Sequence, residues 1–349
     1  MNILVTGNNG YIGIVLTEIL LKKGYQVVGL DTNYYQGCQF CDSGFKIKEI
    51  KKDIRKIEKN DLKDIDAILH LAALSNDPLG EFDPKLTYEI NYESTVELAK
   101  LARETGIKRF VYASSQSMYG ISKNDEELDE DNSMKNPITA YAKTKWDAER
   151  ELKKLGTKSF IVSCFRPSTV FGASPKLRCD IVYNNLVASA YTAGKIEIKS
   201  DGTPWRPVVH IRDACQAFIA GLEAPEELIS GQSFNVGIKN GNYTIKELAE
   251  AAQKVVPGSS LVFTGEHGAD SRTYRVSFKK ILTVLKDYYK PEWDLSRGGK
   301  ELVEFFKEIN FTEEMFKGKN CNRLIQLKYL VENKKLDKNL FWLSNYEKN

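Results

Sequence analysis

The sequence predicts an α/β protein in which helices cover a doubly wound parallel sheet, with a smaller mixed α/β part attached. Two observations predict this fold class. Short β-branched runs alternate with helical patterns along the first half of the chain, as in parallel sheets whose strands are joined by helices. A glycine-spaced turn also separates the first apolar run from the first helical pattern, an arrangement common at the start of such sheets. At 349 residues, the chain is long enough for one large domain or two closely joined ones.

The first elements are a strand, a helix and a second strand. Asn2–Thr6 is apolar and β-branched, and we expect it to be the first strand. In Gly13–Lys23 the apolar residues recur at helical spacing, and Gly24 follows as a helix-ending residue. Gln26–Leu30 is expected to be the second strand, and it ends at Asp31.

The alternation continues through the first half of the chain. Further strands are expected at Ala67–Leu71, Arg109–Ser114 and Phe160–Phe165, and strong helices at Asn91–Glu104 and Thr139–Leu155. Thr139 is a suitable N-cap residue for the second of these helices. The segment Asn124–Lys135 is acidic and polar, and we expect it to be a solvated loop.

After about Ser168 the elements become shorter and more mixed. Helices are expected at Asp180–Ala193, Asp213–Leu222 and Thr244–Val256, and strands at Ile196–Lys199, Val208–Ile211, Phe234–Val236 and Leu261–Thr264. The end of the chain is rich in Lys, Glu and Asn and has helical stretches without a motif. The pattern predicts a main domain over residues 1–167, with 208–232 returning to it. Residues 168–207 and 233–349 are expected to form the smaller domain and a C-terminal tail.

Composition and charge exclude several classes of protein. The chain has 50 basic and 47 acidic residues and a net charge of +3, which argues against a nucleic-acid-binding protein with a concentrated basic face. No apolar run approaches the roughly 20 residues needed to span a bilayer. The N-terminus enters an apolar strand without a basic leader. We therefore expect a cytoplasmic protein that binds neither nucleic acid nor membranes.

Six cysteines include the pair Cys38 and Cys41 in a CxxC spacing. This spacing is found in redox pairs and in half of a zinc site. No second CxxC follows, and the chain has only three histidines. The pair also falls after the second strand and not at the start of a helix, where a thioredoxin-like site would place it. We expect a loop with two incidental thiols and no metal site.

The turn Thr6-Gly7-Asn8-Asn9-Gly10-Tyr11-Ile12-Gly13 joins the first strand to the first helix. In such a turn, backbone N–H groups and a helix N-terminus converge on a point where a diphosphate can bind. Gly7 allows the chain to turn, Gly10 allows phosphates to approach, and Gly13 allows helix and strand to pack closely. The GxxGxxG spacing is a weak signal in a chain with 24 glycines, but the flanking strand and helix favour a dinucleotide site.

Asp31 strengthens this interpretation. It ends the second strand roughly 20 residues after the glycines, where a carboxylate accepts hydrogen bonds from the ribose of adenosine. The same carboxylate would repel a 2′-phosphate, and the next residues, Thr32 and Asn33, are not basic. The sequence therefore predicts NAD as the cofactor in preference to NADP. The alternative is that Asp31 is an ordinary turn residue.

A second group of residues has the pattern of a proton-transfer site. Ser114-Ser115 lies at the end of a central strand, and Tyr141 and Lys145 follow within one helix. Residues i and i+4 share a helix face, so the ammonium can stand near the phenol. The unperturbed pKa of Tyr is about 10, and a nearby positive charge is expected to lower it.

The Tyr–Lys spacing is not sufficient evidence by itself. Tyr119/Lys123 and Tyr191/Lys195 have the same spacing. Gly120 follows the first of these tyrosines, and Gly194 interrupts the second pair. Only Tyr141 and Lys145 lie inside a strong predicted helix downstream of a strand end, where ligands bind in open α/β sheets.

With these features the chain resembles the extended short-chain dehydrogenase/reductase family, in particular its nucleotide-sugar epimerases and dehydratases. The resemblance covers roughly residues 1–275 and implies a Rossmann fold. It rests on the glycine turn and on the following residues: Asp31, Asp53-Ile54, His70-Leu71-Ala72-Ala73, Asn91, Ser114 to Gly120, Tyr141-Ala142-Lys143-Thr144-Lys145, Arg166-Pro167 and Arg206 to Asp213.

The resemblance implies roles for single residues. Ser115, Tyr141 and Lys145 would be the catalytic triad. Cofactor-binding residues would be Gly7, Asn9, Gly10, Tyr11, Ile12, Gly13, Asp31, Asp53, Ile54, Leu71, Ala72, Ala73, Asn91, Lys145 and Pro167. The residues that would hold the nucleotide-diphosphate sugar are Ser117, Thr169, Arg206 and Arg272, with Asn184 or Asn185.

Two residues depart from the family pattern. The 4,6-dehydratases of the family usually have one or two acidic residues directly after the catalytic Ser or Thr, whereas this chain has Gln116 and Ser117. Many relatives have Asn three residues after the Arg of the Arg-Pro strand, and this chain has Thr169. The first departure argues against dehydration, and the second leaves the sugar undetermined.

The resulting expectation is a nucleotide-sugar 4-epimerase that uses NAD and a transient 4-keto sugar. A 4-dehydrogenase or 4-ketoreductase with net redox change is the alternative. A 4,6-dehydratase is less favoured, and a non-catalytic NAD-binding protein is the least favoured. By resemblance, a homodimer is expected, formed by the helices around Asn91–Glu104 and Tyr141–Leu155 with their copies across a two-fold axis.

Overall fold

A computed structural model describes residues 1–349 except 123–125, 266–272, 345 and 347–349. Within the described residues, the main sheet has seven parallel strands in the order β11-β7-β5-β4-β1-β2-β3. The central strands are buried on both faces, which explains their nearly continuous apolar sequences. The strands are β1 (Asn2–Thr6), β2 (Gln26–Asp31), β3 (Lys48–Lys51), β4 (Ala67–His70), β5 (Arg109–Ala113), β7 (Ile161–Pro167) and β11 (Ser233–Val236).

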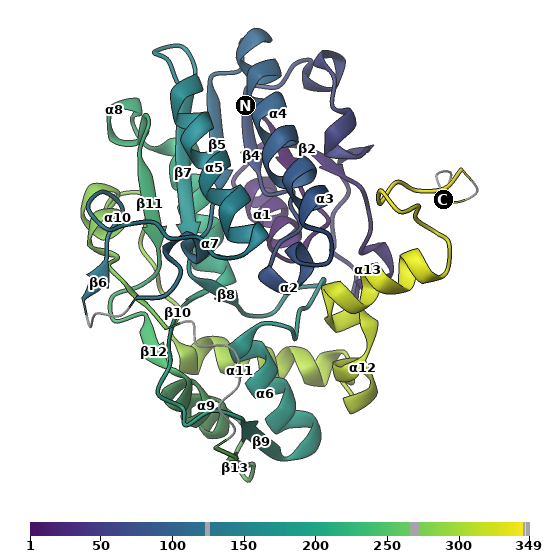
Figure 1. Cartoon of the computed structure of the whole chain (residues 1–349), viewed down its shortest axis with the longest axis vertical. Helices are drawn as coiled ribbons and strands as arrows, with labels where there is room; N and C mark the ends of the chain where they lie inside the picture. Colours follow the sequence, from purple (N-terminus) through teal and green to yellow (C-terminus); the bar gives the residue numbers. More distant parts are fainter. Residues whose placement is uncertain (123–125, 266–272, 345, 347–349) are drawn as a thin grey trace.

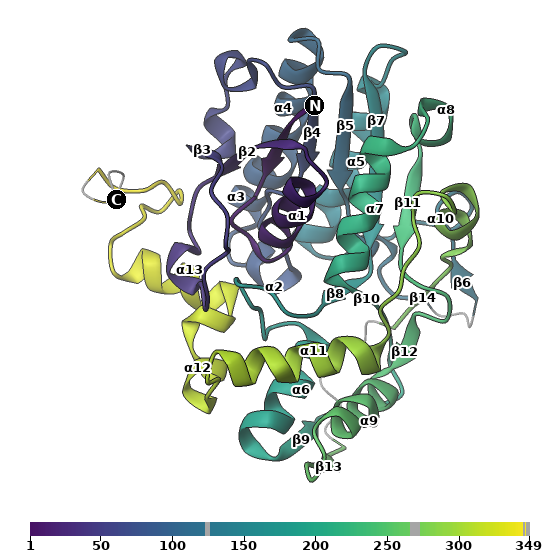
Figure 2. The ribbon, with the colours of Figure 1, turned by 180° about the vertical axis from the view of Figure 1, so that it is seen from behind.

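Helices cover both faces of this sheet, which confirms the doubly wound fold class. Helices α3 (Pro84–Tyr88), α4 (Ser94–Glu104) and α5 (Ala140–Leu155) lie on one face, and α1 (Tyr11–Lys22) and α7 (Ile211–Glu223) on the other (Figures 1 and 2). Side chains alternate between the faces along a strand. Ile3 and Val5 accordingly pack with the α1 and α7 side, and Leu4 packs with the α4 and α5 side.

A smaller part of mixed structure lies below the carboxyl ends of the main strands in Figure 1. Its helices surround a third buried apolar cluster. It contains a three-stranded sheet of β12 (Asn242–Thr244), β10 (Trp205–His210) and β8 (Thr169–Phe171), and pairs of β13 (Ser260–Phe263) with β9 (Lys195–Ile198) and β14 (Arg275–Val276) with β6 (Glu127–Leu128). Its main helices are α6 (Val182–Ala193), α9 (Ile245–Val255) and α11 (Leu295–Glu308).

The remaining α-helices are α2 (Asp77–Gly80), α8 (Glu226–Ile229), α10 (Lys279–Val284), α12 (Glu313–Lys317) and α13 (Arg323–Glu332). In the part of the chain that the structure describes, no helix has the length and apolarity needed to cross a bilayer.

The segments that return to the main domain extend further than the predicted range of 208–232. β11 pairs with β7 and so extends the main sheet. In contrast, β10 pairs with β8 and β12 in the smaller part. The chain therefore crosses between the two parts more often than apolar patterns alone indicate, because strand pairing is set by tertiary contacts.

The helix predicted at Asn91–Glu104 begins with a π-helical turn, Glu89–Glu93, before α4. The Ser94 hydroxyl donates to the Ile90 carbonyl, and the Thr95 hydroxyl donates to the Asn91 carbonyl at 2.9 Å. Such side-chain bonds to the preceding turn compete with regular helical bonds. The irregular turn therefore follows from two hydroxyl residues at the start of the helix.

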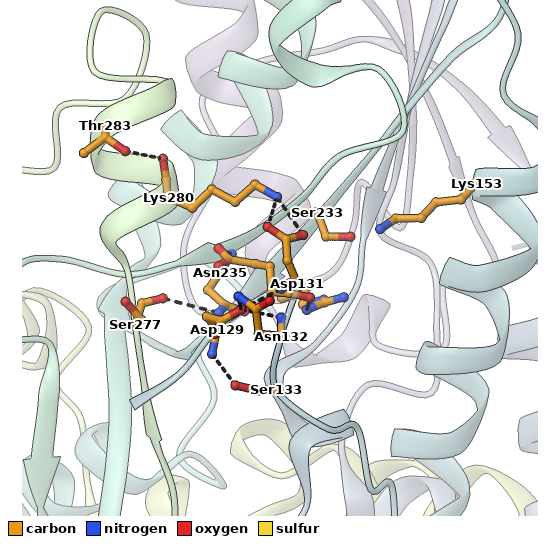
Figure 3. A network of polar contacts seen from close by, with 12 residues as sticks. Asp129, Asp131, Asn132, Ser133, Lys153, Ser233, Asn235, Ser277, Lys280 and Thr283 are labelled. Atoms are coloured by element: carbon orange, nitrogen blue, oxygen red, sulfur yellow. Dashed lines mark hydrogen bonds and ion pairs between the residues drawn. The ribbon is translucent and has the colours of Figure 1, made fainter. Parts of the chain in front are cut away.

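The acidic segment that ends at Lys135 is solvated in part, with Asp131 and Asn132 exposed, but it is also anchored to the fold (Figure 3). Its described part starts at residue 126. Asp129 accepts the backbone N–H groups of Asp131 and Asn132, and Lys280 of α10 pairs with Asp131 at 2.9 Å. Glu130 is buried and accepts the backbone N–H of Asn235 in β11. The segment is therefore fixed between β11 and α10.

The C-terminal segment packs against the main domain beside β2. Leu327, Leu330, Leu336 and Leu340 are buried in the cluster on the α4 and α5 side of the sheet. The Tyr34 hydroxyl donates to the Leu340 carbonyl, and the indole N–H of Trp342 donates to the Thr32 carbonyl, each at 2.6 Å. Figures 1 and 2 show α13 beside the first strands of the main sheet, although it belongs to the other end of the chain.

This packing predicts a stabilising role for the C-terminal segment. Leu327→Ala removes a fully buried side chain from α13, and we expect the free energy of unfolding to fall by about 2–5 kcal/mol. Urea unfolding measures this change. The matched control is Lys328→Ala at the exposed neighbouring position, which should stay within about 0.5 kcal/mol of the wild type. Equal stabilities of the two variants would contradict the packing.

Candidate active site

A cavity of about 920 Å³ lies between the main sheet and the smaller part. Its walls include residues at the carboxyl ends of main-sheet strands. Asp31 and Pro167 end their strands, and Gly7, Leu71, Ser114 and Ser168 directly follow theirs. The opposite wall comes from the smaller part. Parallel sheets bind their ligands at this edge, so the cavity is the candidate active site.

The glycine turn forms one end of the cavity, and its backbone has the tight geometry that its glycines permit. Gly7 has φ +74°, and a Cβ atom there would lie 2.9 Å from the Ala72 backbone nitrogen. A Cβ atom on Gly13 would lie 2.0 Å from the Gly7 carbonyl oxygen. Gly10, Tyr11, Ile12 and Gly13 line the cavity, and no side chain caps the N-terminus of α1. Its free N–H groups suit the diphosphate of a dinucleotide.

The carboxylate of Asp31 lies in the same part of the cavity. It accepts the backbone N–H of Asn33 at 2.7 Å and of Asn9 at 3.1 Å. Burial raises the pKa of Asp31, although these two hydrogen bonds oppose the shift. Asp53 and Ile54 also line the cavity. Asn9 does not line the cavity. Its backbone N–H holds the Asp31 carboxylate beside the glycine turn. The arrangement fits a nucleotide with a free ribose diol.

The loop after β4 supplies Leu71, Ala72 and Ala73 to the cavity wall. Asn91 does not line the cavity. Its side-chain oxygen accepts the Leu74 N–H at 2.8 Å, and its side-chain nitrogen donates to the Leu74 carbonyl at 3.1 Å. Asn91 thus holds the loop in place from behind, which is a structural role that the family motif alone does not distinguish from cofactor contact.

Ser115, Tyr141 and Lys145 all line the cavity. Ser115 follows β5, where its hydroxyl lies 2.9 Å from that of Ser117 and accepts the Ser117 backbone N–H at 3.1 Å. Tyr141 and Lys145 lie one turn apart on α5, which Thr139 caps as predicted. The Ser115 side chain lies near the Tyr141 hydroxyl and opposes the rise of its pKa. The Lys145 ammonium donates to the Ala113 carbonyl at 2.7 Å.

The pKa of Tyr141 differs from the expectation that a nearby ammonium would lower it. Burial raises the pKa of Tyr141 to about 12, and the Ser115 side chain only partly opposes this shift. Burial also lowers the pKa of Lys145 to about 7. Near neutral pH the lysine therefore loses part of the charge that the sequence argument assumed. In the protein without ligands, Tyr141 is a neutral phenol.

A buried ion pair fixes the catalytic helix to the sheet. Glu149 of α5 accepts two hydrogen bonds from the Arg166 guanidinium, with the Nε contact at 3.0 Å. Glu149 also accepts the hydroxyls of Ser114, directly after β5, and of Ser233 in β11, each at 2.6 Å. Burial alone would raise the pKa of Glu149, but the charges of Arg166 and Lys153 and the hydrogen bonds from Arg166 and Ser114 together lower it. Sequence reasoning missed this network because its members are far apart in the chain.

The predicted substrate residues separate into three groups. Ser117, Thr169, Asn185 and Arg206 line the cavity. Asn184 is buried behind it, where it accepts the Gly172 N–H at 3.0 Å and donates to the Arg178 carbonyl at 2.8 Å. Of these two asparagines, only Asn185 therefore lies at the cavity wall. Arg272 lies outside the described residues.

Gln116, which occupies the position where dehydratase relatives have an acidic residue, points away from the cavity. Its side-chain nitrogen donates to the Arg166 carbonyl at 2.9 Å, and its oxygen accepts the Ser168 hydroxyl at 3.2 Å. It is 1% exposed. Gln116 therefore joins β7 to the turn after β5 and is not placed to touch a ligand.

The cysteines and histidines form no metal site in the part of the chain that the structure describes. Cys38 is buried, Cys41 is partly exposed, and no disulfide joins them. His70 is buried between the hydroxyls of Thr6 and Thr95, each at 2.7 Å. Burial lowers the pKa of His70 to about 3, so it is neutral and structural.

The cavity also has walls that no sequence motif indicated. Tyr35, Arg178, Asp180 and Arg323 line it, and they come from a loop after β2, the segment before α6 and the start of α13. Asp77 of α2 lies near Tyr141 and accepts the Thr139 hydroxyl. Charged residues in irregular segments have no spacing that would have identified them.

The buried Lys145 predicts a specific pH dependence of stability. Its pKa is about 7 in the folded protein, compared with 10.5 for an exposed lysine. Between these values the unfolded chain binds more protons at this position than the folded protein does, so this group makes the free energy of unfolding rise with pH. Lys145→Met removes that contribution. As the pH rises from about 7 to about 10, the free energy of unfolding of the wild type should therefore rise relative to that of Lys145→Met.

Urea unfolding of the protein without cofactor, at several pH values, measures this difference. Lys143→Met, at an exposed position of the same helix, is the matched control and should differ from the wild type by a constant amount. A constant difference for Lys145→Met as well would contradict the lowered pKa.

Comparison with known proteins places the chain in a family. The model of the NAD dependent epimerase/dehydratase family matches residues 3–237, more than half of the chain. A UDP-glucuronate 4-epimerase of Thermodesulfobacterium geofontis is 26% identical over 320 residues, which cover 87% of this chain and 96% of the relative. A UDP-glucose 4-epimerase of Bacillus subtilis is 29% identical over 284 residues, with coverage of 73% and 82%.

Solved structures agree with this result. A crystal structure of UDP-glucuronic acid 4-epimerase from Bacillus cereus in complex with NAD has a TM-score of 0.73 and 25% identity, and covers 88% of this chain and 97% of that one. The predicted family, fold class and cofactor are thereby confirmed. The chain belongs to the NAD dependent epimerase/dehydratase family and is an NAD-dependent enzyme of the nucleotide-sugar epimerase/dehydratase type.

Proposed function

We propose that this enzyme is a nucleotide-sugar 4-epimerase that acts through a transient 4-keto sugar. The observation that carries this proposal is the convergence of Ser115, Tyr141 and Lys145 in one cavity without a carboxylate directly after Ser115. The relatives that are UDP-glucose and UDP-glucuronate 4-epimerases support the same reaction and suggest UDP-hexoses as the first substrates to test.

In this proposal the nucleotide sugar extends from the catalytic residues to the smaller part. Arg206 and Asn185 line that end of the cavity, and a guanidinium suits a diphosphate because its planar fork donates paired hydrogen bonds. The sugar then has its C4 hydroxyl near Tyr141.

The three catalytic residues divide the proton chemistry between them. Tyr141 removes the proton of the C4 hydroxyl as a general base and later returns it. Ser115 donates a hydrogen bond to the same oxygen, and Lys145 supplies a positive charge that favours the phenolate when it is protonated. NAD bound in the cavity would supply an acceptor and a donor for the C4 hydride. Inversion at C4 would require the hydride to reach the opposite face of the ketone.

The same residues argue against loss of water. Elimination across C5 and C6 needs a base for the C5 proton and an acid for the departing hydroxyl. Gln116 has no useful pKa and is bonded to the backbone of β7. Ser117 already shares its hydroxyl with Ser115. A 4-dehydrogenase or 4-ketoreductase needs the same three residues, and no contact in the described part of the chain favours it over the epimerase.

We also propose that the enzyme is a homodimer. Helices α4 and α5 lie side by side on one face of the main sheet (Figure 1), where a second copy can pair with them across a two-fold axis. This proposal rests on the family resemblance of these two helices.

The carboxylate of Asp31 predicts selectivity for NAD over NADP, because it repels a 2′-phosphate. We expect the wild type to bind NAD more tightly than NADP and Asp31→Ala to narrow this difference, as measured by calorimetric titration with each cofactor. Asp42→Ala removes a carboxylate from an exposed position after the same strand and should leave the selectivity unchanged. Tighter binding of NADP to the wild type would contradict this role.

Tyr141→Phe tests the proposed chemistry. The variant keeps the ring but loses the group that takes the proton, so we expect kcat for epimerisation to fall by about 10²–10⁴-fold. Incubation of the wild type with UDP-glucose, UDP-glucuronate and other nucleotide hexoses, followed by mass spectrometry, should give a product of unchanged mass.

The matched control is Tyr191→Phe. Tyr191 and Lys195 have the same spacing as the catalytic pair, but neither lines the cavity, so its activity should equal that of the wild type. A product lighter by one water would refute the epimerase proposal, and a mass change of two hydrogens would favour the dehydrogenase or reductase.

A further inference from the structure

The C-terminal segment reaches the cavity at the start of α13. Asn322, Arg323 and Leu324 line the cavity wall, although they lie well beyond residue 237, where the match to the family model ends. The Asn322 side chain accepts the Ile325 N–H at 3.1 Å and caps the helix. The cap fixes the backbone from which the Arg323 side chain leaves. The segment therefore brings groups to the cavity that the family motifs do not include.

Arg323 is a buried cation with an unused hydrogen-bond donor. It is 2% exposed, and its Nη2 donates to the Lys176 carbonyl at 2.6 Å. Among the described residues, no acceptor lies within bonding distance of its Nη1. The guanidinium stacks over the ring of Tyr35, 4.6 Å from the centroid. A buried charged donor without an acceptor is costly, so its retention needs a reason.

Tyr35 carries a second unused polar group. It lines the cavity, and its buried hydroxyl also lacks a hydrogen-bond partner in the described part of the chain. Burial raises the pKa of Tyr35, and the charges of Arg323 and Arg178 oppose the shift. Both guanidinium groups therefore stand near this phenol, which remains protonated and able to donate.

Asp180 is the carboxylate near Arg323, and it is already paired with Arg178 at 2.8 Å. The Lys176 ammonium donates to the carbonyls of Tyr35 and Gln36, and the charges of Asp31 and Glu49 lie near it. Burial and the Arg178 charge lower the pKa of Arg323. Arg323 is thus a buried cation that stands beside two free donors, its own Nη1 and the Tyr35 hydroxyl.

We propose that Arg323 and Tyr35 bind the diphosphate of the dinucleotide. A diphosphate carries two negative charges and only hydrogen-bond acceptors, so it satisfies both free donors and pairs with the buried Arg323 cation. The dinucleotide is favoured over the nucleotide sugar because Tyr35 lies four residues after Asp31. The C-terminal segment also bonds this loop directly, through Gln326 to the Tyr34 carbonyl at 3.1 Å. The proposal rests on the use of NAD in the proposed function.

Calorimetric titration of the full-length protein with NAD⁺, and separately with UDP, tests this assignment. Arg323→Met should weaken NAD⁺ binding by about tenfold or more, since a charge-assisted hydrogen bond is lost. Arg323→Lys keeps the charge without the planar fork and should lose less. Tyr35→Phe removes only the free hydroxyl and should also weaken NAD⁺ binding. UDP affinity should stay at the wild-type value in all three variants.

Lys328→Met is the matched control, because it removes a positive charge from an exposed position of the same helix. Its NAD⁺ affinity should remain within about twofold of the wild type, as for a screened surface charge. Wild-type NAD⁺ affinity in Arg323→Met with an unchanged unfolding midpoint would overturn the proposal, and so would loss of UDP affinity alone.

If Arg323→Met does not fold, the NAD⁺ affinity of Tyr35→Phe tests the proposal instead. An unchanged affinity in that variant would overturn it. The wild-type titration separates this inference from the proposed function. If the wild type does not bind NAD⁺, the proposed function itself is refuted. If the wild type binds NAD⁺ and every variant binds it equally well, only the role of Arg323 and Tyr35 is refuted.

Discussion

The buried ion pair between Glu149 and Arg166 is the interaction on which the active site depends. Glu149 is a buried residue of α5, one turn after Lys145, and Arg166 lies in β7 just before the cavity. The pair also receives hydroxyls from Ser114 and Ser233, so it joins α5 to three neighbouring strands. Removal of one partner from such a pair typically costs about 3–5 kcal/mol. It would also release the helix that carries Tyr141 and Lys145.

The electrostatics of the cavity follow from burial. At the catalytic end, burial keeps Tyr141 protonated and lowers the pKa of Lys145 to about 7. At the cofactor end, the buried Arg323 cation has a free donor. In the proposed binding mode, the diphosphate of the dinucleotide compensates this charge. Since charge on a bound cofactor also changes the balance at the catalytic end, the proton chemistry of Tyr141 is expected to depend on whether the cofactor is present.

Local patterns predicted the fold and the core of the site well, because they depend on short stretches of chain. The glycine turn, the strand ending at Asp31 and the helix capped by Thr139 each need only neighbouring residues. Residues whose roles depend on tertiary contacts could not be assigned in this way. Asn91 was expected to bind the cofactor and Asn184 was one of two candidate substrate residues, yet each bonds backbone behind the cavity. The role of Arg323 depends on a segment without any motif, folded back beside β2.

The central claim is that hydride leaves C4 of the sugar and returns to the same carbon while C5 is untouched. A nucleotide hexose with deuterium at C4, converted to equilibrium in ordinary water and followed by NMR and mass spectrometry, tests this most directly. The account predicts that the C4 epimer keeps its deuterium at C4, and that the reaction in deuterated water introduces no label at C5. Loss of the C4 label, or solvent deuterium at C5, would contradict it.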